Sequence, residues 1–184
     1  MNPERLYFTG NEDADRLIAQ EPLALLIGFA LDQQVTVPTA FLGPLKLKER
    51  LGRLDAKALA EMDPADLEAA FRERPAVHRF PGNMSKRVQE LCATIADEYG
   101  GRAERVWTEA EDGDDLRARI GALPGFGSMK TTSLGAVLAK RFGVAAATDL
   151  VPSHPTLGDV DSAEALERYQ SAKRAYKAKL RAEA

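Results

Sequence analysis

Cysteine is almost absent from this chain of 184 residues, which contains only Cys92. A single cysteine excludes an intrachain disulfide, a multi-cysteine zinc site and a four-cysteine iron–sulfur cluster. Cys92 follows an apolar helical pattern with Val88, Leu91 and Ile95, which is typical of a buried structural thiol rather than of a nucleophile. We therefore expect Cys92 to lie in the core.

Long apolar runs and a strong excess of one charge are also missing. The longest apolar run, Leu23–Leu31, is far too short to cross a bilayer, and Met1–Gly10 lacks the apolar core of a signal peptide. We therefore expect a cytoplasmic protein without a membrane partner, associated with the nucleoid if its source is bacterial. The formal net charge of -3 and the pI near 5.5 argue against a protein that coats nucleic acid through bulk positive charge, so any DNA contact must be local.

Successive strand-like runs separated by hairpin turns do not occur, whereas apolar residues recur at helical spacing along the chain. This pattern predicts an all-α fold. The length suits one compact domain, or two small lobes that share a cleft, and we expect a single domain. The expected helices cover residues 11–20, 23–32, 38–51, 55–62, 63–71, 83–99, 116–123, 128–142 and 162–184. Asn83 is expected to cap the helix that ends at Gly100 and Gly101.

The stretch Leu123–Gly127 joins two of these helices. Pro124 fixes one backbone angle, while Gly125 and Gly127 permit conformations that a side chain would forbid, so the turn can be very tight. Backbone amides at Gly125, Gly127 and Ser128 would then point outward at the start of the next helix, where they could bind a phosphate.

Basic side chains follow the turn, and the segment from 123 to 142 contains no acidic residue. Lys130, Lys140 and Arg141 predict a small basic patch that would reinforce a phosphate site. An ordinary connection between two helices uses the same proline and glycines. The residues alone leave both interpretations open.

The stretch Leu123–Gly127, with the helix that begins Ser128-Met129-Lys130-Thr131, resembles the helix-hairpin-helix of the DNA glycosylase superfamily that includes endonuclease III, the adenine glycosylases and the bacterial alkyladenine glycosylases. Other segments resemble this superfamily in the same order and spacing. They are Phe29–Val37 at the end of a buried helix, Asn83–Arg87 opening the helix before the hairpin, and Asp149 about twenty residues beyond the start of the second hairpin helix.

This resemblance implies a two-lobed, all-α glycosylase fold. The central lobe would cover about 31–142, with the hairpin at 115–142, and the second lobe would combine about 1–30 with 143–184. It also implies an enzyme that extrudes a nucleotide from the duplex, binds the base in a cleft between the lobes and hydrolyses its N-glycosidic bond.

The resemblance assigns roles to individual residues. Gln34 would fill the hole left by the extruded nucleotide, and Asp149 would stabilise charge on the sugar or activate water. The DNA-binding residues would be Gln34, Pro124, Gly125, Phe126, Gly127, Ser128 and Lys130. Without the resemblance, Gln34 could equally be a polar residue at a helix end, and Thr148-Asp149 a helix cap.

The sequence departs from the superfamily at the position of the lyase lysine, two residues after the last glycine of the hairpin, which is Met129 here. Lys130 comes one residue later, and one step turns a side chain by about 100° around the helix axis. Lys130 is therefore expected to contact phosphate, and the enzyme to remove bases without strand cleavage. Met129 is expected to line the pocket, with a place in the core as the alternative.

A second departure concerns Asp149, whose following residues do not reproduce the usual Asp-Thr-His pattern. His154, Asp159 and Asp161 are nearby alternatives, although each suits a loop. We expect His78 to be an exposed loop histidine, with a base contact in the pocket as the alternative. The charged final helix is expected to be a solvated basic face or an extension of the DNA-binding surface. Trp107, Phe41 and Tyr99 are expected in the core.

The predicted function is therefore that of a monomeric, monofunctional DNA N-glycosylase acting on double-stranded DNA with a damaged or mispaired base. No metal site and no cofactor are expected, and one cysteine places the chain near the cluster-free relatives; a monovalent cation at the hairpin remains open. Two alternatives stay beside this prediction. One is a non-catalytic protein that recognises damaged or bent DNA, and the other is a bifunctional glycosylase and lyase that uses Lys130.

Overall fold

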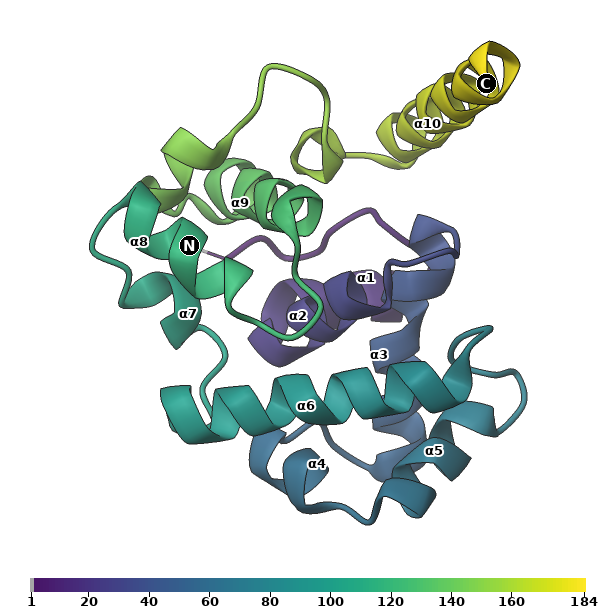
Figure 1. The fold of residues 1–184 in the computed structure, drawn as a ribbon, viewed down its shortest axis with the longest axis vertical. Coiled ribbons are helices and arrows are strands. Elements are labelled where there is room, and N and C mark those ends of the chain that lie inside the picture. Colours follow the sequence, from purple (N-terminus) through teal and green to yellow (C-terminus); the bar gives the residue numbers. More distant parts are fainter. Residues whose placement is uncertain (1) are drawn as a thin grey trace.

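The computed structural model describes residues 2–184, and in this range the chain is helical without β-strands, as predicted (Figure 1). The α-helices are α1 (Glu12–Gln20), α2 (Pro22–Leu31), α3 (Val37–Leu51), α4 (Ala56–Glu61), α5 (Pro64–Arg72), α6 (Pro81–Tyr99), α7 (Arg105–Thr108), α8 (Gly113–Gly121), α9 (Ser128–Phe142) and α10 (Ala163–Glu183). Two 3₁₀ helices, η1 (Ala145–Leu150) and η2 (Leu157–Asp159), connect α9 to α10. None of the described helices is long and apolar enough to span a membrane.

Short polar side chains begin several of the helices. The side chains of Asn11, Asp55, Asp63, Asp112 and Ser162 each accept a hydrogen bond from a backbone N–H in the first turn of the helix that follows. The prediction that Asn83 caps the long helix is wrong, because α6 begins two residues earlier at Pro81. Proline fits a first helical turn, where its missing N–H would have no partner inside the helix.

Helix α2 is the centre of the core, and every residue from Leu23 to Leu31 is buried. It packs on α3 and α6, and α4 and α5 pack on α6, below which Figure 1 shows them. Two glycines permit this close packing: a Cβ atom on Gly28 would lie 2.3 Å from the Phe41 ring, and one on Gly43 would lie 2.4 Å from the Leu31 side chain. Bulkier residues at either position would force these helices apart.

The predicted core residues Phe41, Tyr99, Trp107 and Cys92 are all buried, which confirms these expectations. Burial raises the pKa of the Cys92 thiol to about 12. The thiol is therefore protonated and inert at neutral pH.

The segment after α9 packs back on the hairpin helices. A Cβ atom on Gly135 of α9 would lie 2.6 Å from Leu150 of η1, and one on Gly158 of η2 would lie 2.6 Å from the Ala136 carbonyl oxygen. Helices α1 and α2 pack on α3, whereas η1 and η2 pack on α9. Helix α10 then leaves the body of the protein, as Figure 1 shows, and only Ala165 and Leu166 in it are buried.

The segment before α1 is held by one fully buried carboxylate. Asp15 Oδ1 accepts hydrogen bonds from the backbone N–H of Thr9 at 2.9 Å and from the Thr9 hydroxyl at 2.7 Å. Asp15 Oδ2 lies 3.3 Å from the Arg5 guanidinium. Burial raises the pKa of Asp15 more than these partners lower it. The carboxylate therefore fastens the N-terminal segment to α1.

Candidate nucleic-acid interface

Leu123 and Phe126 anchor the hairpin between α8 and α9 to the hydrophobic core, since each residue is only 3% exposed. Its tight turn depends on Gly125, whose φ of 82° favours glycine. A Cβ atom at Gly125 would also lie 2.1 Å from Arg87 Nη1 of α6, so this guanidinium packs directly against the turn. The Phe126 ring lies in the core and fixes the hairpin, so any contact of Phe126 with DNA would have to come from its backbone.

The outer side of the hairpin presents unpaired donors. Gly127 precedes α9 and supplies no capping side chain, and the amides of Gly125, Gly127 and Ser128 find no acceptor within residues 2–184. The Gly127 carbonyl is occupied instead, since both the amide and the hydroxyl of Thr131 donate to it. Open amides at a helix start, beside the charge of Arg87, suit an anion such as a phosphate.

The turn after α2 holds Gln34 in a conformation that is unusual for a residue with a side chain. Its φ is 57°, and it is the one described non-glycine residue with a positive φ. Gln33 and Gln34 are both exposed, shortly after a helix that is buried from Leu23 to its last residue. A non-glycine residue in the left-handed region costs about 1–2 kcal/mol, so other contacts must hold this turn.

His78 supplies those contacts, and the prediction of an exposed loop histidine is wrong because His78 is only 2% exposed. Its Nδ1 accepts a hydrogen bond from the Phe80 N–H at 3.0 Å. Its Nε2 lies 3.1 Å from the Leu31 oxygen and 3.0 Å from the Gln33 oxygen. Since a carbonyl can only accept, these partners define a neutral ring with the proton on Nε2. Burial lowers the pKa of His78 and favours the same neutral form.

Lys130 joins the hairpin to this turn. Its Nζ donates a hydrogen bond of 3.2 Å to the Ala30 carbonyl oxygen in the last turn of α2, although the two residues lie 100 positions apart in the sequence. Lys130 was expected to face a phosphate, but its half-buried ammonium group points to the end of α2. Burial lowers the pKa of Lys130; the charge of Asp32 opposes this shift, and the charge of Arg87 adds to it.

Asp32 directly follows the last residue of α2, beside the turn that His78 holds. This residue was not singled out by sequence reasoning. Burial raises the pKa of the Asp32 carboxyl, and the charges of Lys173, Lys130 and Lys177 oppose that rise. No hydrogen bond to the Asp32 carboxylate is formed by any residue from 2 to 184. Burial also raises the pKa of Tyr169 in α10, and the charge of Asp32 adds to that effect. We call Asp32, Lys130, Tyr169, Lys173 and Lys177 the Asp32 cluster.

The remaining predicted site residues lie further apart. Met129, in the first turn of α9, is 86% exposed and is therefore neither in the core nor enclosed in a pocket of the protein. Asp149 is exposed in η1, and its Cβ would lie 3.1 Å from a Cβ atom on Gly113, at the start of α8. The length of α8, roughly 12 Å at 1.5 Å per residue, separates that point from the hairpin. The structure does not bring Asp149 to the hairpin or to Gln34.

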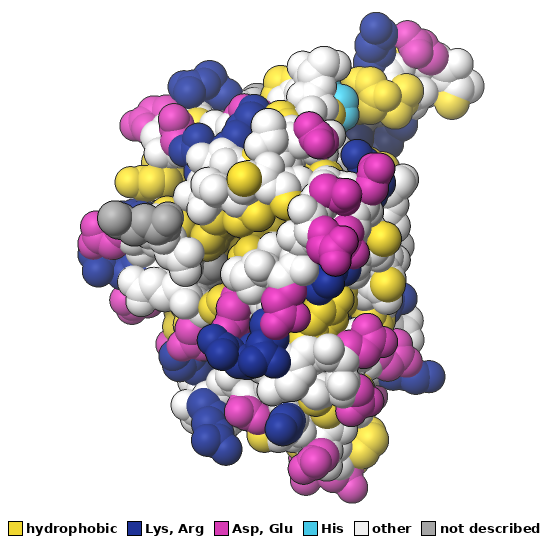
Figure 2. All heavy atoms as spheres, turned by 90° about the vertical axis from the view of Figure 1, so that its left-hand side faces the viewer, with side chains coloured by type: hydrophobic (Ala, Val, Ile, Leu, Met, Phe, Trp, Pro, Cys, Tyr) yellow, Lys and Arg dark blue, Asp and Glu magenta, His cyan; other side chains and the backbone are white. Residues whose placement is uncertain are grey.

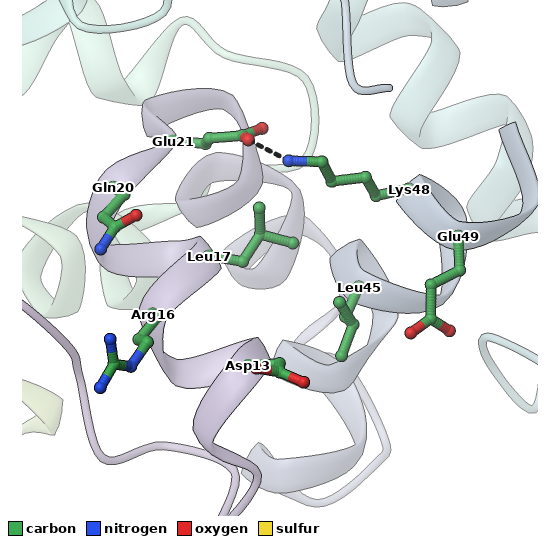
Figure 3. A pocket seen from close by; sticks show the side chains of 8 residues that line it. All are labelled: Asp13, Arg16, Leu17, Gln20, Glu21, Leu45, Lys48 and Glu49. Atoms are coloured by element: carbon green, nitrogen blue, oxygen red, sulfur yellow. Dashed lines mark hydrogen bonds and ion pairs between the residues drawn. The ribbon is translucent and has the colours of Figure 1, made fainter. Parts of the chain in front are cut away.

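Two further pockets open on the surface of the protein. One lies between α1 and α3, where Lys48 pairs with Glu21 and the lining mixes both charges, which does not suit a polyanion (Figure 3). The other adjoins the buried His78 and is lined by Arg72, Arg74 and Arg79. The face in Figure 2 shows acidic and basic side chains interspersed, as expected for a protein whose DNA contacts are local.

Comparison with models of protein families identifies the superfamily of this chain. The model of the HhH-GPD superfamily base excision DNA repair protein matches residues 27–184, which is most of the chain and includes both the Gln34 turn and the hairpin. The chain belongs to the HhH-GPD superfamily. This HhH-GPD protein is thus a base excision DNA repair protein with DNA as its substrate. Comparisons with curated proteins and with solved structures gave no match.

Proposed function

We propose that this HhH-GPD protein is a monofunctional DNA N-glycosylase, which extrudes a damaged or mispaired base from double-stranded DNA and hydrolyses its glycosidic bond. The observation that carries the proposal is the Lys130–Ala30 hydrogen bond. It holds the hairpin, with its open amides, beside the strained turn that presents Gln34. A phosphate anchor and a projecting side chain held together are what nucleotide extrusion requires.

Each part of the interface has a role in this proposal. The amides of Gly125, Gly127 and Ser128 and the guanidinium of Arg87 hold a phosphate beside the target nucleotide. Gln34 enters the duplex, and its amide group can bond to the orphaned partner base. Pro124 shapes the turn, while the exposed Met129 supplies an apolar contact to the DNA next to the phosphate.

The absence of a lyase step follows from the first turn of α9. Met129 occupies the position of the superfamily's lyase lysine and has no nucleophilic nitrogen. We propose that hydrolysis needs no cofactor and no metal, that a monovalent cation at the hairpin carbonyls is at most an aid to phosphate binding, and that the protein acts as a monomer.

The test is base release from duplexes containing uracil opposite guanine, hypoxanthine opposite thymine, 8-oxoguanine opposite adenine, 3-methyladenine, or a G·T mismatch. We expect the wild type to release at least one of these bases, and Gln34→Ala to reduce release strongly while duplex binding changes less. Gly125→Ala should weaken duplex binding, because a Cβ atom there displaces Arg87 and strains the turn. Binding without release of any base would contradict glycosylase activity.

Two other functions have one observation each in their favour. The position of Asp149, exposed and away from the hairpin, favours a non-catalytic protein that recognises damaged DNA. The lowered pKa of Lys130 favours a lyase, because a neutral amine is the form that attacks a sugar aldehyde. Borohydride trapping of a covalent adduct, lost in Lys130→Met, would establish the lyase.

A further inference from the structure

The end of α2 carries a carboxylate whose surroundings differ from those of a structural one. Asp32 follows Ala30 and Leu31, whose carbonyl oxygens are held by Lys130 and His78, and it comes two residues before the exposed Gln34. We propose that Asp32 is the catalytic carboxylate of base removal, and that Lys130 and His78 are positioning residues for the turn that carries it. This assignment rests on the glycosylase function proposed above.

The fold gains little from a carboxylate at this position. A helix C-terminus carries partial negative charge, so an aspartate at the end of α2 is repelled by the helix dipole. The Asp32 carboxylate also forms no hydrogen bond within residues 2–184, and burial disfavours its charge. A residue that costs stability and still stands beside the DNA-facing turn is better explained by chemistry than by packing.

The cluster around Asp32 supplies what such a carboxylate needs. The positive charges of Lys173, Lys130 and Lys177 favour its ionised form, while partial burial makes that form a stronger base than an exposed aspartate. Lys130 belongs to the helix whose first amides are proposed to hold the phosphate. Its hydrogen bond to the Ala30 carbonyl oxygen keeps the start of α9, and with it the proposed phosphate site, beside the end of α2.

The reaction balances without an added reagent other than water. The C1′–N bond breaks and its electron pair leaves with the base. Water forms the new C1′–O bond and gives a proton to the Asp32 carboxylate, which then passes it to the departing base. The products are a free base and an abasic sugar, and developing positive charge on the sugar is stabilised by the carboxylate until water attacks.

The experiment compares three isosteric variants in single-turnover base release at saturating protein, using whichever duplex of the panel above the wild type processes. Asp32→Asn is expected to lower the rate by about 100-fold or more, with duplex binding unchanged or tighter because a negative charge near DNA is lost. Asp149→Asn tests the carboxylate predicted from the sequence. Asp66→Asn removes an exposed charge in α5 and serves as the matched control. Thermal melting checks that each variant is folded.

The outcomes separate the two proposals. A loss of release in Asp32→Asn with retained binding and folding supports Asp32. Full release by Asp32→Asn, or an equal loss of binding and release, overturns its catalytic role while the glycosylase function stands. A loss of release in Asp149→Asn alone assigns the reaction to Asp149. A wild type that binds every duplex and releases no base overturns the glycosylase function together with the role of Asp32.

Discussion

Asp15 and Asp32 are carboxylates whose pKa is raised by burial, but the two regions around them are built differently. Asp15 is fully buried, accepts hydrogen bonds from Thr9 and lies beside Arg5. Asp32 is half-buried at the end of α2, with lysine charges near it and no hydrogen bond to its carboxylate from residues 2–184. One carboxylate has its partners inside the protein, and the other still has room for a partner from outside.

This difference separates a structural carboxylate from a functional one. Buried polar groups in folded proteins are almost always hydrogen-bonded. Removing one of them leaves its buried partners without a hydrogen bond, and their desolvation is then no longer compensated. A carboxylate that lacks those bonds contributes little to folding. Its removal should change binding or chemistry more than it changes stability.

The largest expected effect is the loss of the Asp15 anchor. Asp15→Ala should lower the free energy of unfolding by about 2–4 kcal/mol, because the Thr9 and Arg5 donors lose their acceptor in a buried place. Urea unfolding followed by circular dichroism measures this change. Asp13→Ala, at an exposed position of the same helix, is the control and should stay within about 0.5 kcal/mol of the wild type. Equal losses in both variants would contradict the anchoring role.

The next effect concerns His78, which holds the turn next to Asp32. His78→Ala should cost roughly 1–3 kcal/mol, because the Leu31 and Gln33 carbonyls and the Phe80 amide all lose their partner. The lowered pKa of His78 means that the unfolded chain binds a proton more readily than the folded one.

The contribution of His78 to the free energy of unfolding is therefore complete above the ordinary histidine pKa of about 6.5. It is lost as the pH falls through the lowered pKa that His78 has in the folded protein. Unfolding curves at several pH values should show this loss in the wild type and not in His78→Ala. The exposed His154→Ala is the control and should keep the wild-type pH dependence. If His78→Ala keeps it too, the proton assignment on the ring is wrong.

A smaller effect of opposite sign is expected at Asp32. Asp32→Asn should raise the free energy of unfolding at pH 7 by roughly 0.3–1 kcal/mol, because it removes a negative charge from a helix C-terminus. The raised pKa of Asp32 means that the charged form costs stability above that pKa, and that this cost disappears as the pH falls towards the unfolded value of about 3.9.

The advantage of Asp32→Asn over the wild type should accordingly shrink as the pH is lowered through this window. Asp66→Asn should show no such advantage, since Asp66 is exposed and lies in the first turn of α5, where negative charge is favourable. Destabilisation by Asp32→Asn at neutral pH would place Asp32 with Asp15, as a structural carboxylate.

Sequence patterns predicted the helices and the core well, because both depend on local spacing. The glycine turn, the wholly apolar α2 and the buried Cys92 were all visible in the sequence. Asn83 was misplaced because proline at Pro81 begins a helix as readily as an asparagine caps one. The burial of the Phe126 ring could not be predicted, because its place in the hairpin says nothing about the direction of its ring.

The site was harder to predict because its contacts are long-range. His78 meets Leu31 and Lys130 meets Ala30 across many residues, and no periodicity encodes either pairing. Asp32 could have drawn attention as the first charge after nine buried residues, at a helix end that disfavours a negative charge. The catalytic role predicted for Asp149 remains a prediction, and its spacing from the hairpin in sequence did not translate into proximity in the fold.

The smallest effect is expected at Gln34, where stability and function should again separate. Gln34→Gly relieves the left-handed strain of the turn but adds chain entropy to the unfolded state. The free energy of unfolding should therefore rise by a net amount of roughly 0.5 kcal/mol. The same change removes the side chain proposed to enter the duplex, so base release should fall while thermal stability rises slightly. Gln33→Gly is the matched control, because Gln33 lacks a positive φ and its replacement should cost stability instead. A stabilised Gln34→Gly that keeps full base release would show that the Gln34 side chain has no part in base removal. Asp32 would then be the remaining residue that distinguishes this region from the structural region around Asp15.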